Sequence, residues 1–271
     1  MLAAMFSPGG PTVRELAVQG LSSVERGYDL LAPKFDATPF RTPERVLDAT
    51  AAALRPLGPY ARGLDLCCGT GAGVGVLQRL CTEGVVGLDR SAGMLAAGRA
   101  SAAGPVEWVR ADALALPFGP AFQLVVSFGA FGHFLPSQRP ALFRRVSEVL
   151  CGGGRFAFPV AAPPRPGSAA YWATLGFDTA MRLRNAVHRP RFVMYYRTFP
   201  LREVLADLHA ADLVPRLHPL PDLGRRPDGT PRAALVVATR TRRAARGVGP
   251  SRHGPGAEHG PVAEGPLRPA C

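Results

Sequence analysis

Short apolar runs without polar alternation are the feature of the sequence that most constrains its fold. Six such runs recur, separated by segments long enough to form helices: residues 62–67, 84–89, 106–110, 122–128, 154–160 and 233–239. Strands buried on both faces of a parallel sheet show this pattern, because neither face meets water. Strand and helix therefore alternate, which predicts an α/β fold with a doubly wound, mainly parallel sheet.

The segments between the runs carry apolar stripes at helical spacing. Two stripes lie late in the chain, one of Leu142, Phe143, Val146, Val149 and Leu150, the other of Leu201, Val204, Leu205 and Leu208. An earlier helix is expected to begin with Thr42 as N-cap and Pro43 in its first turn. We expect helices both before the first strand and between the later ones.

The stretch LDLCCGTGAG, residues 64–73, ends the first run in closely spaced glycines. Glycine adopts positive φ freely and has no Cβ, so such a loop lets a ligand approach the backbone closely. The glycines follow the pattern G-x-G-x-G, and Val74 stands where a dinucleotide fingerprint needs its third glycine. Asp65, inside the first run, would repel a pyrophosphate and suits a cationic ligand.

Two further aspartates follow the next two runs. Asp89 ends the second run, 18 residues after Gly71, and Asp112 follows the third run, with Ala113 beside it. Carboxylates at these positions can accept hydrogen bonds from a ligand at the edge of the sheet. The alternative for each aspartate is that it only caps the next helix.

These motifs resemble those of the class I S-adenosylmethionine-dependent methyltransferases, in particular the small-molecule type seen in ubiquinone and menaquinone biosynthesis. The resemblance covers roughly residues 25–240 and lies in LDLCCGTG, in GVVGLDRSAGML (84–95), in VRADALALPF (109–118) and in YDLLAPKFD (28–36). It implies a seven-stranded Rossmann-like sheet with N-terminal helices and an inserted lid region.

The resemblance also implies S-adenosyl-L-methionine as the cofactor. Its binding residues are then expected to be Tyr28, Asp65, Cys67, Gly69, Gly71, Asp89, Arg90, Met94, Asp112, Ala113 and Ser127. In the family the tyrosine lies over the cofactor, the acid that ends the second strand holds the ribose hydroxyls, and an Asp after the third strand meets the adenine amine. The resemblance thus implies that Asp89 accepts from both ribose hydroxyls and that Asp112 accepts from the amine. Asp65 could then receive the ammonium group of the cofactor, directly or through water. Gln123 stands where an aspartate is common, which leaves the contribution of that strand open.

Methyl transfer from a sulfonium needs proximity and alignment more than catalytic side chains. The segment SFGAFGHFLPSQ, residues 127–138, follows the fourth run, where the acceptor site of the family borders the sulfonium. His133 is the titratable residue there, and its ordinary pKa of about 6.5 suits a base that takes a proton from the acceptor. The alternative is that His133 caps a turn or packs between Phe131 and Phe134.

The domain plan has three parts. Residues 1–20 are expected to be a partly ordered extension, residues 21–241 the methyltransferase domain, and residues 242–271 a disordered tail rich in Arg, Gly and Pro. Within the domain, about residues 161–200 are more than a connection requires, and their aromatic side chains predict a lid over an apolar acceptor pocket. The alternative is that half of these side chains pack in the core.

Charge and cysteine content argue against several classes of protein. The net charge is +12, but 31 of the 32 basic residues are arginines dispersed along the chain, so we expect no nucleic-acid partner. The five cysteines show no C-x-x-C spacing, so we expect small buried thiols, with neither a disulfide framework nor a metal site. A redox or metal role for Cys67 and Cys68 is the less favoured alternative.

The uncharged stretch 113–138 is broken by prolines and glycines, so we expect no membrane span, and a cytoplasmic protein. A monomer is the default, with a homodimer left open. The predicted function is methyl transfer to a small, largely apolar metabolite by in-line displacement, giving S-adenosylhomocysteine. The alternatives are a non-catalytic S-adenosylmethionine-binding protein and, less favoured, a nicotinamide dehydrogenase.

Overall fold

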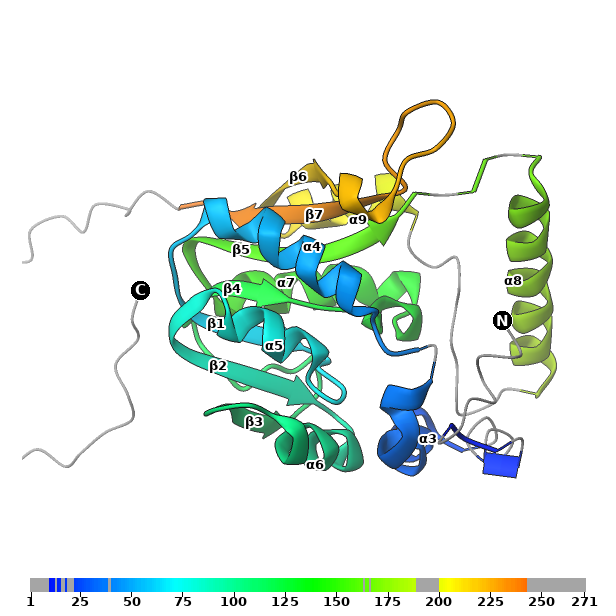
Figure 1. The fold of residues 1–271 in the computed structure, drawn as a ribbon, viewed down its shortest axis with the longest axis horizontal. Helices are drawn as coiled ribbons and strands as arrows, with labels where there is room; N and C mark the ends of the chain where they lie inside the picture. The colour runs from blue at the N-terminus through cyan, green and yellow to red at the C-terminus, as the bar shows by residue number, and fades with distance from the viewer. Residues whose placement is uncertain are drawn as a thin grey trace, which may run out of the picture.

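A seven-stranded sheet organises the residues that the computed structural model describes, which are 10–12, 14–15, 18, 22–38, 40–162, 164–165, 167–188 and 200–242. Its strand order is β3-β2-β1-β4-β5-β7-β6 (Figure 1). The strands are β1 (Tyr60–Leu66), β2 (Cys81–Asp89), β3 (Glu107–Arg110), β4 (Phe122–Val126), β5 (Leu150–Ala161), β6 (Leu213–Pro219) and β7 (Ala233–Arg240). Only β7 runs opposite to the others, so the prediction of a doubly wound, mainly parallel sheet is confirmed.

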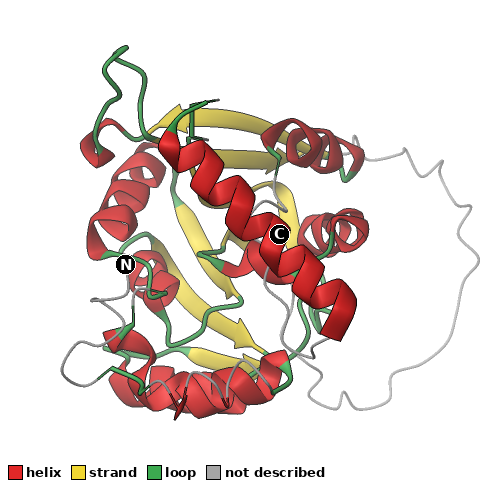
Figure 2. Ribbon diagram, turned by 90° about the vertical axis from the view of Figure 1, so that its right-hand side faces the viewer, coloured by secondary structure: helices red, strands yellow, loops and turns green. Residues whose placement is uncertain are grey.

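Helices cover both faces of this sheet and close two apolar cores. On one face lie α4 (Glu44–Leu54), α5 (Ala72–Gln78) and α6 (Ala92–Ser101); on the other lie α7 (Arg139–Val149) and α9 (Leu201–Ala210) (Figures 1 and 2). Short 3-10 turns join them, namely η2 (Arg55–Leu57), η3 (Ala130–His133), η4 (Pro136–Gln138) and η5 (Pro221–Leu223). Strands with fully buried side chains on both faces explain why the apolar runs do not alternate.

Two local expectations differ from the structure. Pro43, not Thr42, is the N-cap of α4, and no side chain caps that helix, so the predicted start is wrong by one residue. Leu150 is the first residue of β5 and not the end of a helical stripe. Both differences are at element ends, where one backbone angle decides the boundary.

The strand β6 has no matching run in the sequence analysis. Its residues include Pro215 and Pro219, and the side chains of Val214 and Leu217 are exposed. An edge strand tolerates proline and exposure, since half of its backbone groups face away from the sheet. The apolar pattern therefore does not reveal it.

Two segments cross the edge of the sheet where the parallel strands end. The helix α3 (Val24–Leu31) and the turn η1 (Ala32–Ala37), together called the cover below, pack against α6. The helix α8 (Ala169–His188) lies farther out on the same side and crosses in front of the strand ends in Figure 2. None of the described helices is long and apolar enough to cross a membrane.

Only part of the predicted lid falls within the described residues. Tyr171, Trp172 and Phe177 lie on α8, and the last two are exposed. The side chains of Met181, Phe192, Met194, Tyr195 and Tyr196 lie outside the described residues, as does the tail from residue 243. The lid, the tail and the domain boundaries stay predictions.

Cysteine pairing departs from expectation at one position. Cys151, in β5, is disulfide-bonded, whereas Cys67, Cys68 and Cys81 are free. The expectation that the cysteines are unpaired thiols is therefore wrong at Cys151, because pairing depends on proximity in space, which spacing along the chain does not give.

Candidate active site

A cavity of about 640 Å³ opens at the carboxyl ends of the parallel strands, between them and the cover. This volume is in the range of small-molecule sites. Ten of the predicted site residues line it: Tyr28, Asp65, Cys67, Gly69, Asp89, Arg90, Met94, Asp112, Ala113 and His133. The fold thus brings together side chains that are up to 105 positions apart in sequence.

The loop between β1 and α5 forms the floor of the cavity. Cys67, Gly69 and Gly71 have φ values of 57°, 53° and 91°, so the loop turns through three left-handed residues. The Gly69 N–H donates to Asp89 Oδ2 at 2.9 Å, and the Cys68 N–H donates to the Leu88 carbonyl at 2.9 Å. These bonds fix the loop to the end of β2. A Cβ at Gly69 would have only the Phe35 ring, 4.0 Å away, as a neighbour, so this glycine opens the floor toward the cavity.

Asp65 is a buried acid without a partner. Its side chain is 1% exposed, and neither carboxylate oxygen accepts a hydrogen bond. Burial raises the pKa of this carboxyl well above its ordinary value. The backbone N–H groups of Val74 and Gly73 lie close enough to oppose this shift, but neither makes a hydrogen bond of ordinary geometry to the carboxyl. An isolated buried carboxylate is costly, and a cationic group in the cavity would relieve that cost. This orphaned acid fits the ammonium group of the predicted cofactor.

Asp89 is held in place by backbone donors. Oδ2 accepts from the Gly69 N–H and Oδ1 from the Ser91 N–H, both at 2.9 Å. Burial raises its pKa, and the neighbouring carboxylate of Asp29 adds to the effect. Each carboxylate oxygen can accept a second hydrogen bond, so Asp89 can still accept from a pair of hydroxyls.

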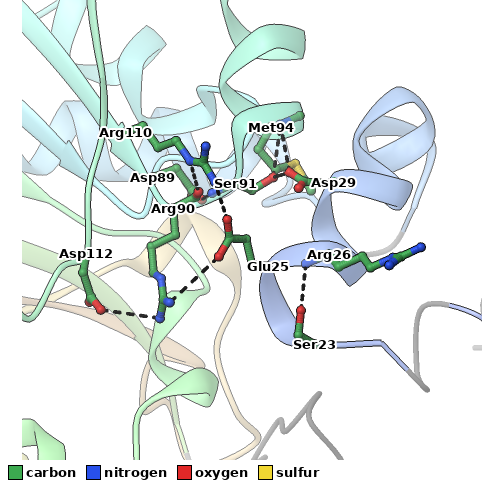
Figure 3. A network of polar contacts seen from close by, with 11 residues as sticks. Ser23, Glu25, Arg26, Asp29, Asp89, Arg90, Ser91, Met94, Arg110 and Asp112 are labelled. Carbon is green, nitrogen blue, oxygen red and sulfur yellow. Dashed lines mark hydrogen bonds and ion pairs between the residues drawn. The ribbon is translucent and has the colours of Figure 1, made fainter.

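Asp112 and Arg90 belong to a chain of charges at the mouth of the cavity (Figure 3). Asp112 Oδ1 accepts from the Leu114 N–H at 2.9 Å, and its Oδ2 lies 3.5 Å from Arg90 Nη1. Glu25, from the cover, pairs with Arg110 and lies 4.0 Å from Arg90 Nη2. The charge chain therefore ties the cover to β3 and to the loop after it.

Two aspartates of the cover complete this attachment. Asp29 Oδ1 accepts from Ser91 Oγ at 2.5 Å and from the Gly93 N–H at 2.9 Å, next to the start of α6. Asp36 Oδ1 accepts from Thr70 Oγ1 at 2.6 Å, on the glycine loop itself. No local sequence pattern indicates these contacts, although both acids lie within the YDLLAPKFD motif.

His133 ends η3 and faces the cover. Its Nε2 lies 2.7 Å from Tyr28 Oη, and the two rings meet edge to face with centroids 5.3 Å apart. Phe131 packs onto Phe158 in the core, with centroids 4.8 Å apart. His133 and Tyr28 both line the cavity.

The rest of the wall beyond the glycine loop is largely apolar. Its aromatic members are Phe35 and Phe40 from the cover region and Phe128 and Phe134 from the segment after β4. Together with Ala130 they form what we call the aromatic half, as opposed to the carboxylate half of Asp65, Asp89 and Asp112. Arg90 is the only lysine or arginine among the described residues that line the cavity.

Two predicted residues do not line the cavity. The Ser127 hydroxyl is buried and donates to the Leu66 carbonyl at 2.9 Å, which ties β4 to β1. Gly71 is the N-cap of α5, and a Cβ there would lie 2.9 Å from the Trp108 ring. Gln123 also has a structural contact, since its Oε1 accepts from the Arg62 N–H at 2.7 Å near the start of β4.

The Cys67 thiol lines the cavity but is poorly suited to redox chemistry. Burial, with the carboxylates of Asp89 and Asp65 nearby, raises the pKa of Cys67 well above its ordinary value. The thiolate, which is the reactive form, is therefore disfavoured. Among the described residues, no three His, Cys, Asp or Glu side chains group as a metal site.

Comparisons with known proteins give this geometry a context. Residues 64–154 match the methyltransferase domain family. A 2-phytyl-1,4-naphtoquinone methyltransferase of Thermosynechococcus vestitus is 39% identical over 101 residues, 36% of this chain and 44% of the relative. A trans-aconitate 2-methyltransferase of Deinococcus radiodurans is 39% identical over 111 residues, 41% of this chain and 42% of the relative. The chain thus matches less than half the length of either relative.

A solved S-adenosylmethionine-dependent methyltransferase of Mesorhizobium loti superposes with a TM-score of 0.50 at 25% identity, over 72% of this chain and all of that one. These matches confirm the predicted resemblance and imply S-adenosylmethionine as the cofactor. The orphaned Asp65 carboxylate and the open floor at Gly69 are consistent with that group.

Proposed function

From the methyltransferase domain of residues 64–154 and the class I fold around it, we propose that this protein is an S-adenosylmethionine-dependent methyltransferase that acts on a small, largely apolar acceptor. The observation that carries the proposal is the unpartnered, buried carboxylate of Asp65 beneath a glycine loop, opposite an aromatic wall. When bound, the cofactor supplies an activated methyl group on a sulfonium.

The carboxylate half would hold the cofactor by its polar ends. Asp65 would accept from the ammonium group, Asp89 from the ribose hydroxyls and Asp112 from the adenine amine. The backbone donors on Asp89 preset its orientation before the ligand arrives. The cover, with Tyr28 above the cavity, would exclude water.

His133 would remove the proton of the acceptor. In the tautomer whose Nε2–H donates to Tyr28 Oη, the basic lone pair is on Nδ1, which then accepts that proton. Tyr28, which is part of the cover, would orient the imidazole. The aromatic half would hold the acceptor against the methyl donor.

The lining of the cavity favours a neutral acceptor over an anionic one. Three aspartates and Glu25 contribute to the wall, and Arg90 is already close to two of these carboxylates. A tricarboxylate such as the one named for the Deinococcus relative would meet this negative field. An apolar ring such as the one named for the Thermosynechococcus relative matches the aromatic half better.

Two other functions compete with this one. A non-catalytic S-adenosylmethionine-binding protein would share the carboxylate half, and a nicotinamide dehydrogenase would require a dinucleotide in the same cavity. We further propose a cytoplasmic monomer with neither nucleic acid nor membrane as a partner, on the strength of the sequence alone.

The test is calorimetric titration of the full chain with S-adenosylmethionine, S-adenosylhomocysteine and NAD in parallel. Binding of the two adenosyl compounds but not NAD supports the proposal. Labelled methyl donor is then offered with a reduced naphthoquinone and with trans-aconitate. Methylation of the first supports an apolar acceptor, and methylation of the second overturns it. Binding of NAD alone, or of nothing, overturns the proposed function.

A further inference from the structure

The Trp108 indole, on β3, lies against three glycines from three different elements. A Cβ at Gly71 of the glycine loop would lie 2.9 Å from ring atom Cη2, and one at Gly87 of β2 would lie 3.0 Å from Cε3 and Cζ3. A Cβ at Gly98 of α6 would lie 2.7 Å from Cη2 and Cζ3. Real Cβ atoms essentially never come closer than 3.0 Å, as those at Gly71 and Gly98 would, and the contact at Gly87 would be unusually tight. The ring therefore occupies space that glycine leaves free.

The same ring adjoins the part of the loop whose conformation is most demanding. Gly71 has φ +91° and is the N-cap of α5. A Cβ at Gly98 would also lie 3.1 Å from the Thr70 carbonyl carbon, so α6 packs directly on the loop backbone. The loop is therefore supported from below by the indole and α6 together.

Trp108 itself does not line the cavity, so any effect on a ligand must pass through the loop. On the upper side of the loop, the Gly69 N–H donates to Asp89 and the Thr70 hydroxyl donates to Asp36 of the cover. These two bonds place the proposed ribose acceptor and close the cavity. A shift of the loop by a few tenths of an ångström would lengthen both.

We propose that Trp108 is a positioning residue for the cofactor, a support that fixes the glycine loop at Gly71 and thereby holds Gly69 and Thr70 in contact with Asp89 and the cover. The inference rests on the proposed function. A role limited to core packing predicts something different, namely a loss of stability without a selective loss of cofactor affinity.

The first variant adds a methyl group where α6 meets both the indole and the Thr70 backbone of the loop. Gly98→Ala lies inside α6, where alanine is the better helix former, so helix propensity does not destabilise the fold. The added Cβ would lie 2.7 Å from the indole and 3.1 Å from the Thr70 carbonyl carbon, so the ring or the loop must move. We expect the Kd for S-adenosylmethionine, and the KM for it in turnover, to rise about tenfold while the KM for the acceptor is unchanged.

Gly75→Ala is the matched control. Gly75 lies inside α5, and a Cβ there would meet nothing within 4 Å. We expect its Kd to equal that of the wild type. The double variant Gly98→Ala with Trp108→Phe tests whether the effect passes through the indole, because the smaller ring leaves room for the new methyl. We expect it to bind the cofactor more tightly than Gly98→Ala alone.

The outcomes distinguish failure of the proposed function from failure of the positioning role of Trp108. If the wild type binds no adenosyl ligand, the proposed function fails. If the wild type binds and Gly98→Ala, folded by thermal melting, keeps its Kd, the support role is wrong. It is also wrong if the double variant binds no better than Gly98→Ala. Should Gly98→Ala not fold, Trp108→Phe decides: a raised Kd with unchanged acceptor KM supports the role, and an unchanged Kd overturns it.

Fluorescence gives a second readout. The chain has two tryptophans, and Trp172→Phe leaves Trp108 as the sole indole. We expect S-adenosylmethionine to shift or quench the Trp108 emission in this variant, although the ring does not line the cavity. An emission spectrum that does not change at saturating ligand would contradict a mechanical link between ring and loop.

Discussion

The two halves of the cavity are built in different ways. In the carboxylate half, Asp65 lies one residue before the end of β1, Asp89 ends β2 and Asp112 follows β3. Backbone N–H groups hold the last two in place. The aromatic half is assembled from side chains of the cover and of the segment after β4, which are distant in sequence. The position of the carboxylate half is set by the ends of the parallel strands. The shape of the aromatic half depends on how separate segments pack together.

The difference suggests what each half controls. A site fixed by strand ends and backbone donors is suited to a ligand common to a whole family. A site made of side chains on loops can change its shape with few substitutions, and such loops commonly set specificity. We therefore expect substitutions in one half to act on the cofactor and those in the other to act on the acceptor or on turnover.

The largest effect is expected at His133. Because a positioned general base contributes about 10²- to 10⁴-fold, His133→Ala should lower kcat by that range while leaving the Kd for S-adenosylmethionine unchanged. His218→Ala, on the edge strand β6, is the control and should keep wild-type turnover. Wild-type turnover in the His133 variant would assign this residue to structure alone.

Asp65→Asn should have the next largest effect. Removal of the charge that faces the ammonium group should weaken cofactor binding by about 2 to 3 kcal/mol, the range of hydrogen bonds to charged groups. Calorimetry measures it, with Asp178→Asn as control because that buried acid on α8 also has one unpartnered oxygen but does not line the cavity. Equal affinities in the two variants would remove Asp65 from the site.

Asp89→Ala should weaken cofactor affinity by about 1 to 3 kcal/mol. Part of the loss comes from the ribose hydroxyls and part from the Gly69 N–H, which loses its acceptor. Titration of this variant beside Asp48→Ala, which breaks only an exposed pair with Arg79, separates the site from a general charge effect. Unchanged affinity would exclude Asp89 from the carboxylate half.

A smaller effect is expected in the aromatic half. Phe134→Leu keeps an apolar surface but changes its shape, so the KM for the acceptor should rise a few-fold, about 1 kcal/mol, with the cofactor Kd unchanged. Steady-state kinetics with either substrate varied measures both quantities. A change in the cofactor Kd instead would mean that the two halves do not act separately.

The smallest expected effect is on stability against pH. Burial raises the pKa of the Asp65 carboxyl, so the folded chain keeps this proton at pH values where the unfolded chain, with a pKa of about 4, has lost it. The folded state then binds more protons, and ligand-free stability falls as pH rises through that window. Urea unfolding of the wild type should show a steeper fall above pH 4 than Asp65→Asn, and parallel curves would contradict the raised pKa.

The residues of the carboxylate half could be predicted because they lie in short motifs near strand ends. The bonds from Asp29 to Ser91 and from Asp36 to Thr70 could not, since each joins residues that no local pattern relates. The strand β6 was missed because Pro215 and its exposed neighbours break the apolar run. The packing of Trp108 on Gly71, Gly87 and Gly98 likewise depends on three elements meeting in space.

The cover has a further consequence for how the chain assembles as it is made. Lys34 of the cover pairs with the earlier Glu15. The partners that attach the cover to the cavity, Thr70, Ser91, Arg110 and His133, all come later in the sequence. Since synthesis proceeds from the N-terminus, α3 emerges before any residue that can hold it. The sheet edge must form first, so the part of the cavity wall that is synthesised earliest is the last to dock.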